Sequence, residues 1–510
     1  MTSALTHTRR LLGWGRTLAR HGALLELERS DKTPSGLRRL FRLARLGLRT
    51  PARPDYPAAL RAVGPAAIKL GQALATRPDL VGEATARELM TLQDRVPPVP
   101  FPLIRREIED AFGRPLEKLY ARFDPEPVGA ASVAQVHRAT LPDGRDVAVK
   151  VLRPGIEDDM ARATETYEWA AAHLEERGGE FERLRPRQVI ATFRKWTATE
   201  LDLRREAASA SELRALMEGE PDFFVPKVDW PRTSRRVLTI DWVHGTKLGD
   251  REVLLAAGHD LPRLARILTR TFLVQAVRHG FFHADLHHGN LFATPDGRIA
   301  AIDFGIMGRI DAQARRWLAE ILYGLITGDY DRVAAIHFEA GYVPPHHSQA
   351  DFATALRAVG EPIRGLPVKE ISVGGMLDGL FGITRDFDMA TQPHLLLLQK
   401  TLVMNEGVAT HLDPDINMWD AAEPFLRDWI RDELGPEARL ANAIRGAIRT
   451  ARLGPDLLRR ADRLVPKPGG APPAPPLPVV ATIKPAGLLK PAAIALVSLA
   501  LGAAGALTLT

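Results

Sequence analysis

Three side chains near the middle of the chain carry oxygen atoms at a spacing that suits phosphate chemistry: Asp285, Asn290 and Asp303. The carboxylate of Asp285 could accept a proton from, or orient, an attacking hydroxyl or water. Asn290 and Asp303 offer the hard oxygen ligands that Mg²⁺ prefers, and the metal would hold nucleotide phosphates. Their order, with Asp303 in an Asp-Phe-Gly triplet, is typical of a kinase catalytic loop and its metal-binding loop. The sequence therefore predicts phosphoryl-transfer chemistry that uses ATP and Mg²⁺.

The strands that must position these side chains are predicted from the alternation of apolar and polar residues. The run Asp146–Val151 alternates apolar and polar residues around Lys150, so it predicts a half-buried strand. In the kinase fold a lysine on this strand reaches the α- and β-phosphates. An exposed lysine on an edge strand is the alternative, which the downstream catalytic loop disfavours. The turn signal Pro142–Gly144 joins this strand to an earlier one at residues 133–139, so the two form a hairpin.

The segment that leads into this hairpin should lie over the phosphates, and it contains Gly129, Ala130, Ala131 and Ser132. Ordinary kinases have three glycines here, which let backbone N–H groups approach the phosphates. This chain has one, and each added Cβ narrows the available backbone conformations. We expect a stiffer loop and a handling of nucleotide that differs from that of a typical protein kinase.

Taken together, these residues resemble the UbiB family of kinase-like proteins, which is associated with ubiquinone (coenzyme Q) biosynthesis in bacteria and mitochondria. The resemblance covers roughly residues 55 to 430. Prolines usually stand at the positions of Leu286 and His288, so this catalytic loop departs from the family pattern at two positions. The further motifs that resemble the family are Lys69-Leu-Gly71-Gln72, the alanine-rich loop 129–132, Glu200-Leu-Asp202, Glu206-Ala207 and the strand Val237–Val243.

The resemblance implies roles for these motifs. Glu206 is the helix glutamate expected to pair with Lys150. The expected catalytic residues are therefore Lys150, Glu206 and Asp285. Asp241 and Val243, in the strand that links the lobes, are expected to bind nucleotide. The resemblance implies regulatory roles for Lys69, Gly71 and Gln72, which lie on an extension that folds across the active site. It implies the same for Glu200 and Asp202. Lys69 is expected to contact this acidic pair near the nucleotide.

Composition bounds the class of protein. The 510 residues contain no cysteine, which excludes disulfides, a thiolate nucleophile and a zinc–cysteine site. The net charge is +6, but residues 1–54 hold eleven Arg and one Lys against three acidic residues. The run 36–49 could form a helix that lies on an anionic lipid surface. Alternatively, such a helix packs on the kinase core and keeps its arginines in water. Nucleic-acid binding is not expected, because no recognition motif or aromatic stacking platform is present.

The C-terminal end has two distinct segments. Residues 466–490 are rich in Pro and Gly and predict an extended linker. Residues 491–510 carry no charge, and at a rise of ~1.5 Å per residue they just span the ~30 Å hydrocarbon layer of a membrane. Lys484 and Lys490 flank this run, so the catalytic domain is expected on the cytoplasmic face of the inner membrane. A helix in the membrane interface, or buried between subunits, is the alternative.

These features predict an α+β, bilobal protein-kinase-like fold with an N-terminal helical extension, a helix-rich C-lobe and a C-terminal transmembrane helix. The predicted segments are a basic amphipathic region (1–54), the helical extension (55–123), the N-lobe (124–243), the helical C-lobe (244–465), the linker (466–490) and the span (491–510).

Three functions remain open. The first is a membrane-associated kinase-like ATPase that supports ubiquinone biosynthesis by acting on or mobilising prenylated phenol intermediates, or by organising other biosynthetic enzymes. The second is a phosphotransferase on a lipid or protein, although no peptide-docking Ala-Pro-Glu follows Asp-Phe-Gly. The third is a nucleotide-binding scaffold without turnover. A direct ring hydroxylase is rejected, because His283 and His287 are better read as a brace of the catalytic loop and a solvated side chain than as a metal pair.

Overall fold

The computed structural model of the chain describes most of the first 434 residues: 4–25, 35–48, 51, 53–75, 85, 88–89, 92, 96–176, 185–364, 382–384, 386–389 and 393–434. The predicted linker (466–490) and span (491–510) therefore lie outside the described residues. Within the described part, none of the helices combines the length and the apolar character that crossing a membrane requires.

A four-stranded antiparallel sheet forms the core of the smaller lobe, in the order β1-β2-β3-β5. The strands are β1 (Arg122–Ala130), β2 (Ala134–Thr140), β3 (Asp146–Leu152) and β5 (Val237–Asp241). Val147, Val149 and Val151 point to one face, where they pack with α8 (Phe101–Phe112) and α9 (Leu116–Leu119). Because side chains alternate along a strand, Lys150 points to the opposite face.

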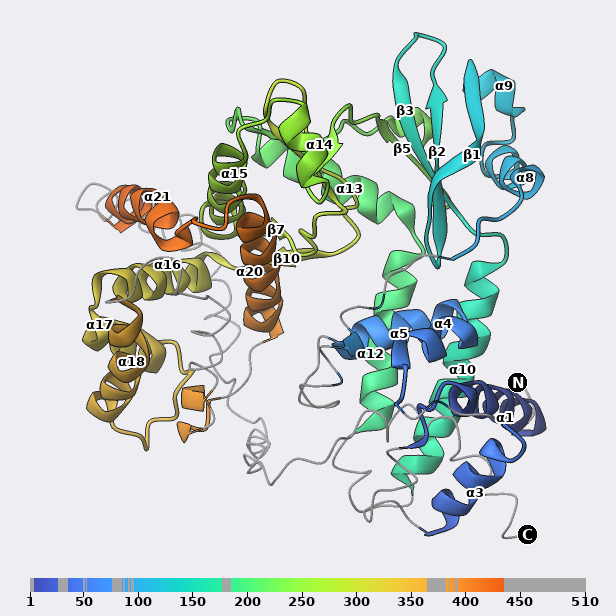
Figure 1. Cartoon of the computed structure of the whole chain (residues 1–510), viewed down its shortest axis with the longest axis horizontal. Helices are drawn as coiled ribbons and strands as arrows, with labels where there is room; N and C mark the ends of the chain where they lie inside the picture. The colour runs from blue at the N-terminus through green and yellow to red at the C-terminus, as the bar shows by residue number, and fades with distance from the viewer. Residues whose placement is uncertain are drawn as a thin grey trace, which may run out of the picture.

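The basic N-terminal region and the helical extension pack beside this lobe (Figure 1). The basic region contains α1 (Ala4–Arg20) and α3 (Ser35–Arg45), and the extension begins with α4 (Tyr56–Val63) and α5 (Pro65–Ala75). These four helices share one apolar cluster with α10 (Ile156–Glu175) and α12 (Pro186–Glu200). In α1, Leu11 and Leu18 are buried, while Arg9, Arg16 and Arg20 are exposed. The structure thus packs α1 on the protein core and leaves these arginines facing outwards.

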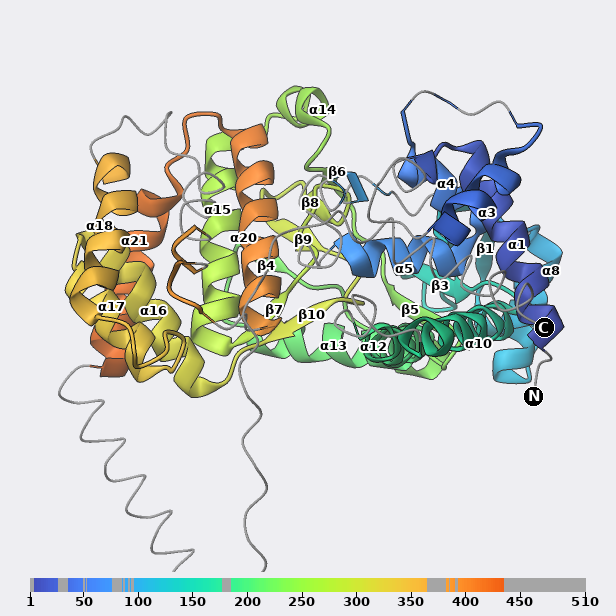
Figure 2. The same cartoon turned by 90° about the horizontal axis from the view of Figure 1, so that it is seen from below.

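Helix α13 (Leu203–Leu216) runs from the sheet towards the larger, helix-rich lobe (Figures 1 and 2). The helices of that lobe are α14 (Arg251–Ala256), α15 (Leu261–Leu273), α16 (Ala312–Thr327), α17 (Tyr330–Glu339), α18 (Gln349–Arg364), α20 (Pro393–Leu412) and α21 (Met418–Leu434), with a π-helical turn at Val274–His279. A 3-10 turn at Trp230–Arg232 precedes β5 and contacts it in the smaller lobe. The described part of the chain thus has the α+β, two-lobed arrangement that the sequence predicts.

Two small sheets in the larger lobe hold the catalytic and metal-binding loops. Strands β4 (Phe223–Phe224), β9 (Ile299–Ala301), β8 (Leu291–Ala293) and β6 (Thr246–Lys247) form one, and β10 (Met307–Arg309) pairs with β7 (Phe281–His283) in the other. The catalytic loop joins β7 to β8, and the Asp-Phe-Gly triplet joins β9 to β10. Because β7 pairs with β10 and β8 with β9, the two loops are fixed side by side.

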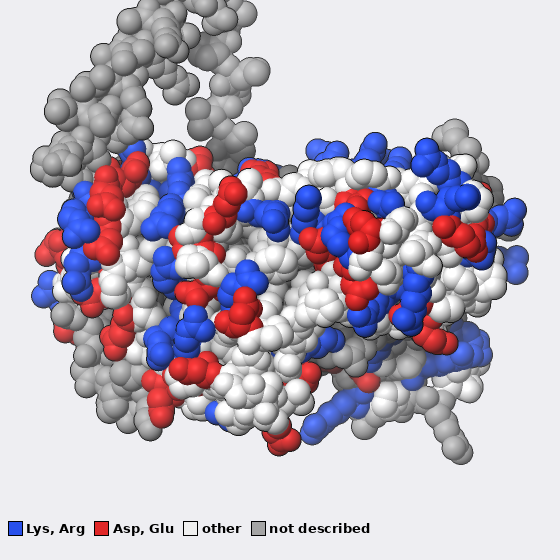
Figure 3. Space-filling model, turned by 90° about the horizontal axis from the view of Figure 1, so that it is seen from above, with Lys and Arg blue, Asp and Glu red and all other residues white. Residues whose placement is uncertain are grey.

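Charged side chains of both signs intermingle on the face shown in Figure 3. The surface contains many close pairs of arginine with a carboxylate, such as Arg332 with Glu320 and Glu339. Exposed pairs of this kind contribute little each to stability. The net charge of +6 is therefore not gathered into one basic patch on this face.

Candidate active site

An ion-pair cluster of Lys150, Glu206 and Asp303 joins the two lobes. Lys150 Nζ lies 2.9 Å from both carboxylate oxygens of Glu206 and 3.2 Å from Asp303 Oδ1. Glu206 is on the first turn of α13, whose N-terminus is capped by Asp202. The Lys150–Glu206 pair is the ion pair that an active kinase site requires, and Asp303 lies beside it. The structure thus brings together three residues that are far apart in the sequence.

The charges in this cluster change each other's proton affinity. Burial raises the pKa of Glu206 to about 7, although the Lys150 ammonium favours the charged form. Burial disfavours the ammonium of Lys150, but the carboxylates of Asp303 and Glu206 outweigh it and raise the lysine pKa. Desolvation also acts against the Asp303 carboxylate, yet Lys150 lowers its pKa to about 2. Asp303 is therefore ionised, as a metal-binding carboxylate must be.

The catalytic loop is braced by His283, which is fully buried. The backbone N–H of Asp285 donates to His283 Nδ1 at 3.1 Å, so the other ring nitrogen carries the proton and donates to the carbonyl of Ile302 at 3.1 Å. Burial lowers the pKa of His283, which keeps the ring neutral in this role. His287 is exposed on the same loop, as the sequence predicts. Leu286, where the family usually has proline, is buried in the core and anchors the loop by packing.

The two residues predicted to hold Mg²⁺, Asn290 and Asp303, have oxygen atoms that could bind a metal ion. Asn290 uses its amide nitrogen to donate to the backbone carbonyl of Asp285 at 3.1 Å, which leaves the amide oxygen for a cation. Asp303 stands in the left-handed region with φ of 61°, a conformation that Asp and Asn tolerate better than most residues. One of its oxygens faces Lys150, and its side chain is half-exposed. An amide oxygen and an ionised carboxylate therefore fit a hard divalent cation.

The alanine-rich loop is tied down from two sides. Gly129 and Ala130 are the last residues of β1, and the carbonyl of Ala130 accepts from the N–H of Val96 at 3.3 Å. Arg153 donates to the carbonyl of Ala131 at 2.8 Å. Ser132 is fully buried, and within the described residues its hydroxyl has no hydrogen-bond partner. This tethering agrees with the stiffness expected from the sequence, while contact with phosphates stays a prediction.

The extension reaches the site through Lys69 on α5. Lys69 is buried, forms an ion pair with Glu200 and lies over the ring of Trp196. Its charge also helps to lower the pKa of Asp303. Asp202, the other predicted acidic partner, caps α13 and pairs with Arg204 at 2.7 Å. The predicted contact of Lys69 with Glu200 near the site is thus present in the structure.

The other two members of this motif lie on the same helix. A Cβ on Gly71 would overlap the side chains of Leu60 and Leu92, so glycine permits the close packing of α5. Gln72 is half-buried on α5. Helix α5 contacts both α10 and α12, and both views place it beside α12 (Figures 1 and 2). The regulatory roles of Gly71 and Gln72 stay predictions.

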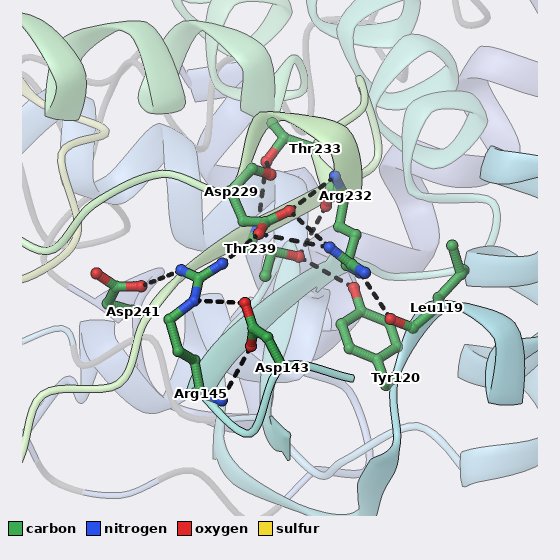
Figure 4. A network of polar contacts seen from close by, with 9 residues as sticks. All are labelled: Leu119, Tyr120, Asp143, Arg145, Asp229, Arg232, Thr233, Thr239 and Asp241. Carbon is green, nitrogen blue, oxygen red and sulfur yellow. Dashed lines mark hydrogen bonds and ion pairs between the residues drawn. The ribbon is translucent and has the colours of Figure 1, made fainter. Parts of the chain in front are cut away.

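Asp241 and Val243 lie at the connection between the lobes, but the side chain of Asp241 is engaged elsewhere. Arg145 donates to its carboxylate at 3.1 Å and to Asp229 at 3.3 Å, in the polar network of Figure 4. The backbone N–H of Asp241 donates to the carbonyl of Lys227. On β5 the side chain alternates away from Leu238, which pairs with Lys150. The Asp241 carboxylate therefore lies on the face of β5 opposite to Lys150, and the nucleotide contacts of Asp241 and Val243 stay predictions.

One residue at the site was missed by the sequence reasoning. Lys400 Nζ, on α20, lies 3.3 Å from Asp285 Oδ1. The two residues are 115 positions apart, and no motif pointed to the lysine. The packing of α20 against α15 within the larger lobe brings the two residues together.

Comparisons with known proteins agree with this geometry. The profile of the ABC1 atypical kinase-like domain matches residues 91–337, and that of the UbiB helical domain matches residues 356–417. Curated relatives named "Probable protein kinase UbiB" are 43% identical over 382 residues in Marinobacter nauticus and 40% identical over 388 residues in Pseudomonas fluorescens. The alignments cover 74% and 75% of this chain, and 70% and 73% of those relatives.

A solved structure of the Rv3197–erythromycin complex from Mycobacterium tuberculosis is 24% identical, with a TM-score of 0.48 over 69% of this chain and 90% of that chain. The identities to the curated relatives, over more than two thirds of their length, are far stronger. The chain belongs to the UbiB family of ABC1 atypical kinase-like proteins.

Proposed function

We propose that the chain is a membrane-associated, atypical kinase-like ATPase that supports ubiquinone biosynthesis. The observation that carries this proposal is the joined cluster of Lys150, Glu206 and Asp303 beside the loop that holds Asp285 and Asn290. A nucleotide-binding scaffold without turnover would not need all five groups. The family of the chain supports the link to ubiquinone biosynthesis, because the related proteins carry the UbiB name.

Each residue has a distinct task in this proposal. Lys150, oriented by its ion pair with Glu206, contacts the α- and β-phosphates of ATP. Asn290 and Asp303 would hold Mg²⁺ through one amide oxygen and one carboxylate, and the metal would supply positive charge opposite the phosphates. Asp285 orients the attacking hydroxyl or water. Most of the rate increase then comes from positioning and electrostatics.

The surroundings of the site favour a small acceptor. Lys69 and Glu200 bring the extension close enough for Lys69 to influence Asp303. Helix α16 begins at Ala312, directly after β10, so the chain between them is too short for a peptide-docking segment. Water or a small, lipid-like molecule is therefore the proposed acceptor. Phosphorylation of a lipid or a protein is the second candidate.

Membrane association is proposed from charge and from the C-terminal run. Arg9, Arg16 and Arg20 of α1 are exposed, and each basic residue near anionic lipid adds roughly 1 kcal/mol of attraction. Residues 491–510 carry no charge and follow the Pro-rich stretch 466–490. A prenylated quinone precursor resides in the bilayer, so a tethered catalytic domain on the cytoplasmic face of the inner membrane would meet it there. Other ubiquinone-biosynthesis proteins are proposed partners.

A phosphate-release assay tests the proposal. The purified full-length chain is given Mg²⁺ and ATP, with and without anionic liposomes and prenylphenol analogues. We expect basal release that rises with liposomes or analogue and disappears in Lys150→Met. Nucleotide binding without release under any of these conditions would favour the scaffold. Release that only an added polypeptide stimulates would favour protein phosphorylation.

A further inference from the structure

We propose that Lys400 is a positioning residue for Asp285, so that the helical domain at residues 356–417 completes the catalytic site. This inference rests on the proposed function, because it assigns a task to Lys400 in the same phosphoryl transfer. It concerns a contact between the two matched regions of the chain, which lie in succession along the sequence.

The contact is close and partly sheltered from solvent. Lys400 Nζ lies 3.3 Å from Asp285 Oδ1, and the two side chains are only 25% and 27% exposed. Charges in such a setting are screened less than on an open surface. The other carboxylate oxygen, Oδ2, lies 3.8 Å from His287 Nε2, beyond hydrogen-bond distance. Lys400 therefore engages one oxygen of Asp285 and leaves the other available to an acceptor hydroxyl or water.

The helix that carries Lys400 is firmly seated. Leu398, Val408 and Leu412 of α20 belong to the same apolar core as Leu286 of the catalytic loop. Asn405 is fully buried and donates to the carbonyl of Leu268 on α15. Helix α20 packs along α15 and also contacts β10. The position of the ammonium is thus set by core packing, which is what a positioning role requires.

The distribution of basic residues shows why a distant lysine is needed. The catalytic loop, residues 280–290, contains no Lys or Arg. Lys150 is held by Glu206 and Asp303, and Lys69 is held by Glu200. Arg298, the nearest basic residue after the loop in the sequence, pairs with Asp296. Lys400, from a distant helix, is the lysine that pairs with Asp285 in the described part of the chain.

The charge of Lys400 has a consequence for the reaction. Without a cation beside it, the Asp285 carboxylate could rotate towards water or towards the Lys150 cluster. With Lys400 in contact, the carboxylate keeps one orientation while the acceptor oxygen attacks the phosphorus and the bond to the ADP oxygen breaks. The acceptor proton leaves towards the free oxygen of Asp285. Positioning of this kind acts on turnover more than on the binding of ATP.

The test compares Lys400→Met with Lys400→Arg and with Leu356→Ala, in the full-length chain. Leu356 is buried on α18, in an apolar cluster separate from the one that seats α20. Leu356→Ala therefore removes core packing from the same helical domain without touching Lys400, and it reports a purely structural effect. Phosphate release gives kcat and KM, and quenching of tryptophan fluorescence gives the dissociation constant of Mg·ATP. The double variant with Asp285→Asn shows whether the two residues act together.

We expect Lys400→Met to lower kcat at least tenfold, with the Mg·ATP dissociation constant within twofold of the parent. Lys400→Arg should recover most of the rate, and Leu356→Ala should lower the melting temperature with little change in kcat of the folded protein. In the Asp285→Asn background, Lys400→Met should have almost no further effect. Equal turnover of the parent and Lys400→Met, or fully additive effects, would overturn this inference alone. Absence of turnover in the parent would overturn the proposed function, and this inference with it.

Discussion

Asp303→Asn is the sharpest single perturbation of the site, because it removes one charge and little else. Asn has nearly the same shape, and at φ of 61° it tolerates the left-handed backbone as well as Asp does. The change takes away an ionised metal ligand whose pKa is about 2 and which lies 3.2 Å from Lys150. Loss of transition-state electrostatics of this kind typically costs about 3 kcal/mol, or roughly a hundredfold in rate.

The assay is phosphate release at saturating Mg²⁺ and ATP, with a thermal melt to verify folding. We expect turnover to fall about a hundredfold or more. Asp388→Asn is the matched control, because Asp388 also has a positive φ, of 49°, and it lies outside the catalytic and metal-binding loops. That variant should keep the parent rate. If Asp303→Asn hydrolyses ATP at the parent rate, the assignment of Asp303 to the metal is wrong.

Three further predictions concern the loop, the cluster and the tail. Ala130→Gly should restore backbone freedom and change the affinity for ATP or ADP, measured by calorimetry; equal affinities in both proteins would mean that the loop does not touch the phosphates. A carboxyl whose pKa rises from 4.5 to about 7 on folding contributes stability that is complete below 4.5 and is lost as the pH rises through about 7. The unfolding free energy of the parent relative to Glu206→Gln should therefore fall across this range in denaturant titrations, and a constant difference would refute the assigned shift. Deletion of residues 484–510 should move the protein towards the soluble fraction, with high salt releasing the rest; a truncated protein that stays bound in high salt would place the anchor elsewhere.

Local patterns predicted the catalytic elements well. The alternation around Lys150 predicted β3, and the turn signal at Pro142–Gly144 predicted its hairpin with β2. Asp285, Asn290 and Asp303 could be assigned because their spacing along the chain is itself the signal. The pairing of Lys150 with Glu206, and of Lys69 with Glu200, came from the family resemblance, and the structure contains both contacts.

Other features depended on tertiary packing and left no local signal. Lys400 reaches Asp285 only because the apolar face of α20 packs on α15. Nothing local indicated that the carboxylate of Asp241, predicted to bind nucleotide, accepts from Arg145, which also donates to Asp229 on the other face of β5. The predicted helix in the run 36–49 was equally consistent with lying on lipid and with packing on the protein, because periodicity defines the apolar face of a helix but not what covers that face. In the structure α3 spans most of this run, and its Phe41 is buried in the apolar cluster shared with α1.

The central claim is that this site transfers the γ-phosphate of ATP to water or to a small acceptor. The most direct measurement follows ATP labelled in its γ-phosphate, incubated with the full-length chain, Mg²⁺ and liposomes that contain a prenylphenol analogue. Thin-layer and gel separation then divide the label among free phosphate, lipid and protein. We predict label in free phosphate or in the lipid fraction, and none in either with Asp303→Asn. Label that stays in ATP, or that appears mainly on added polypeptides, would contradict the account.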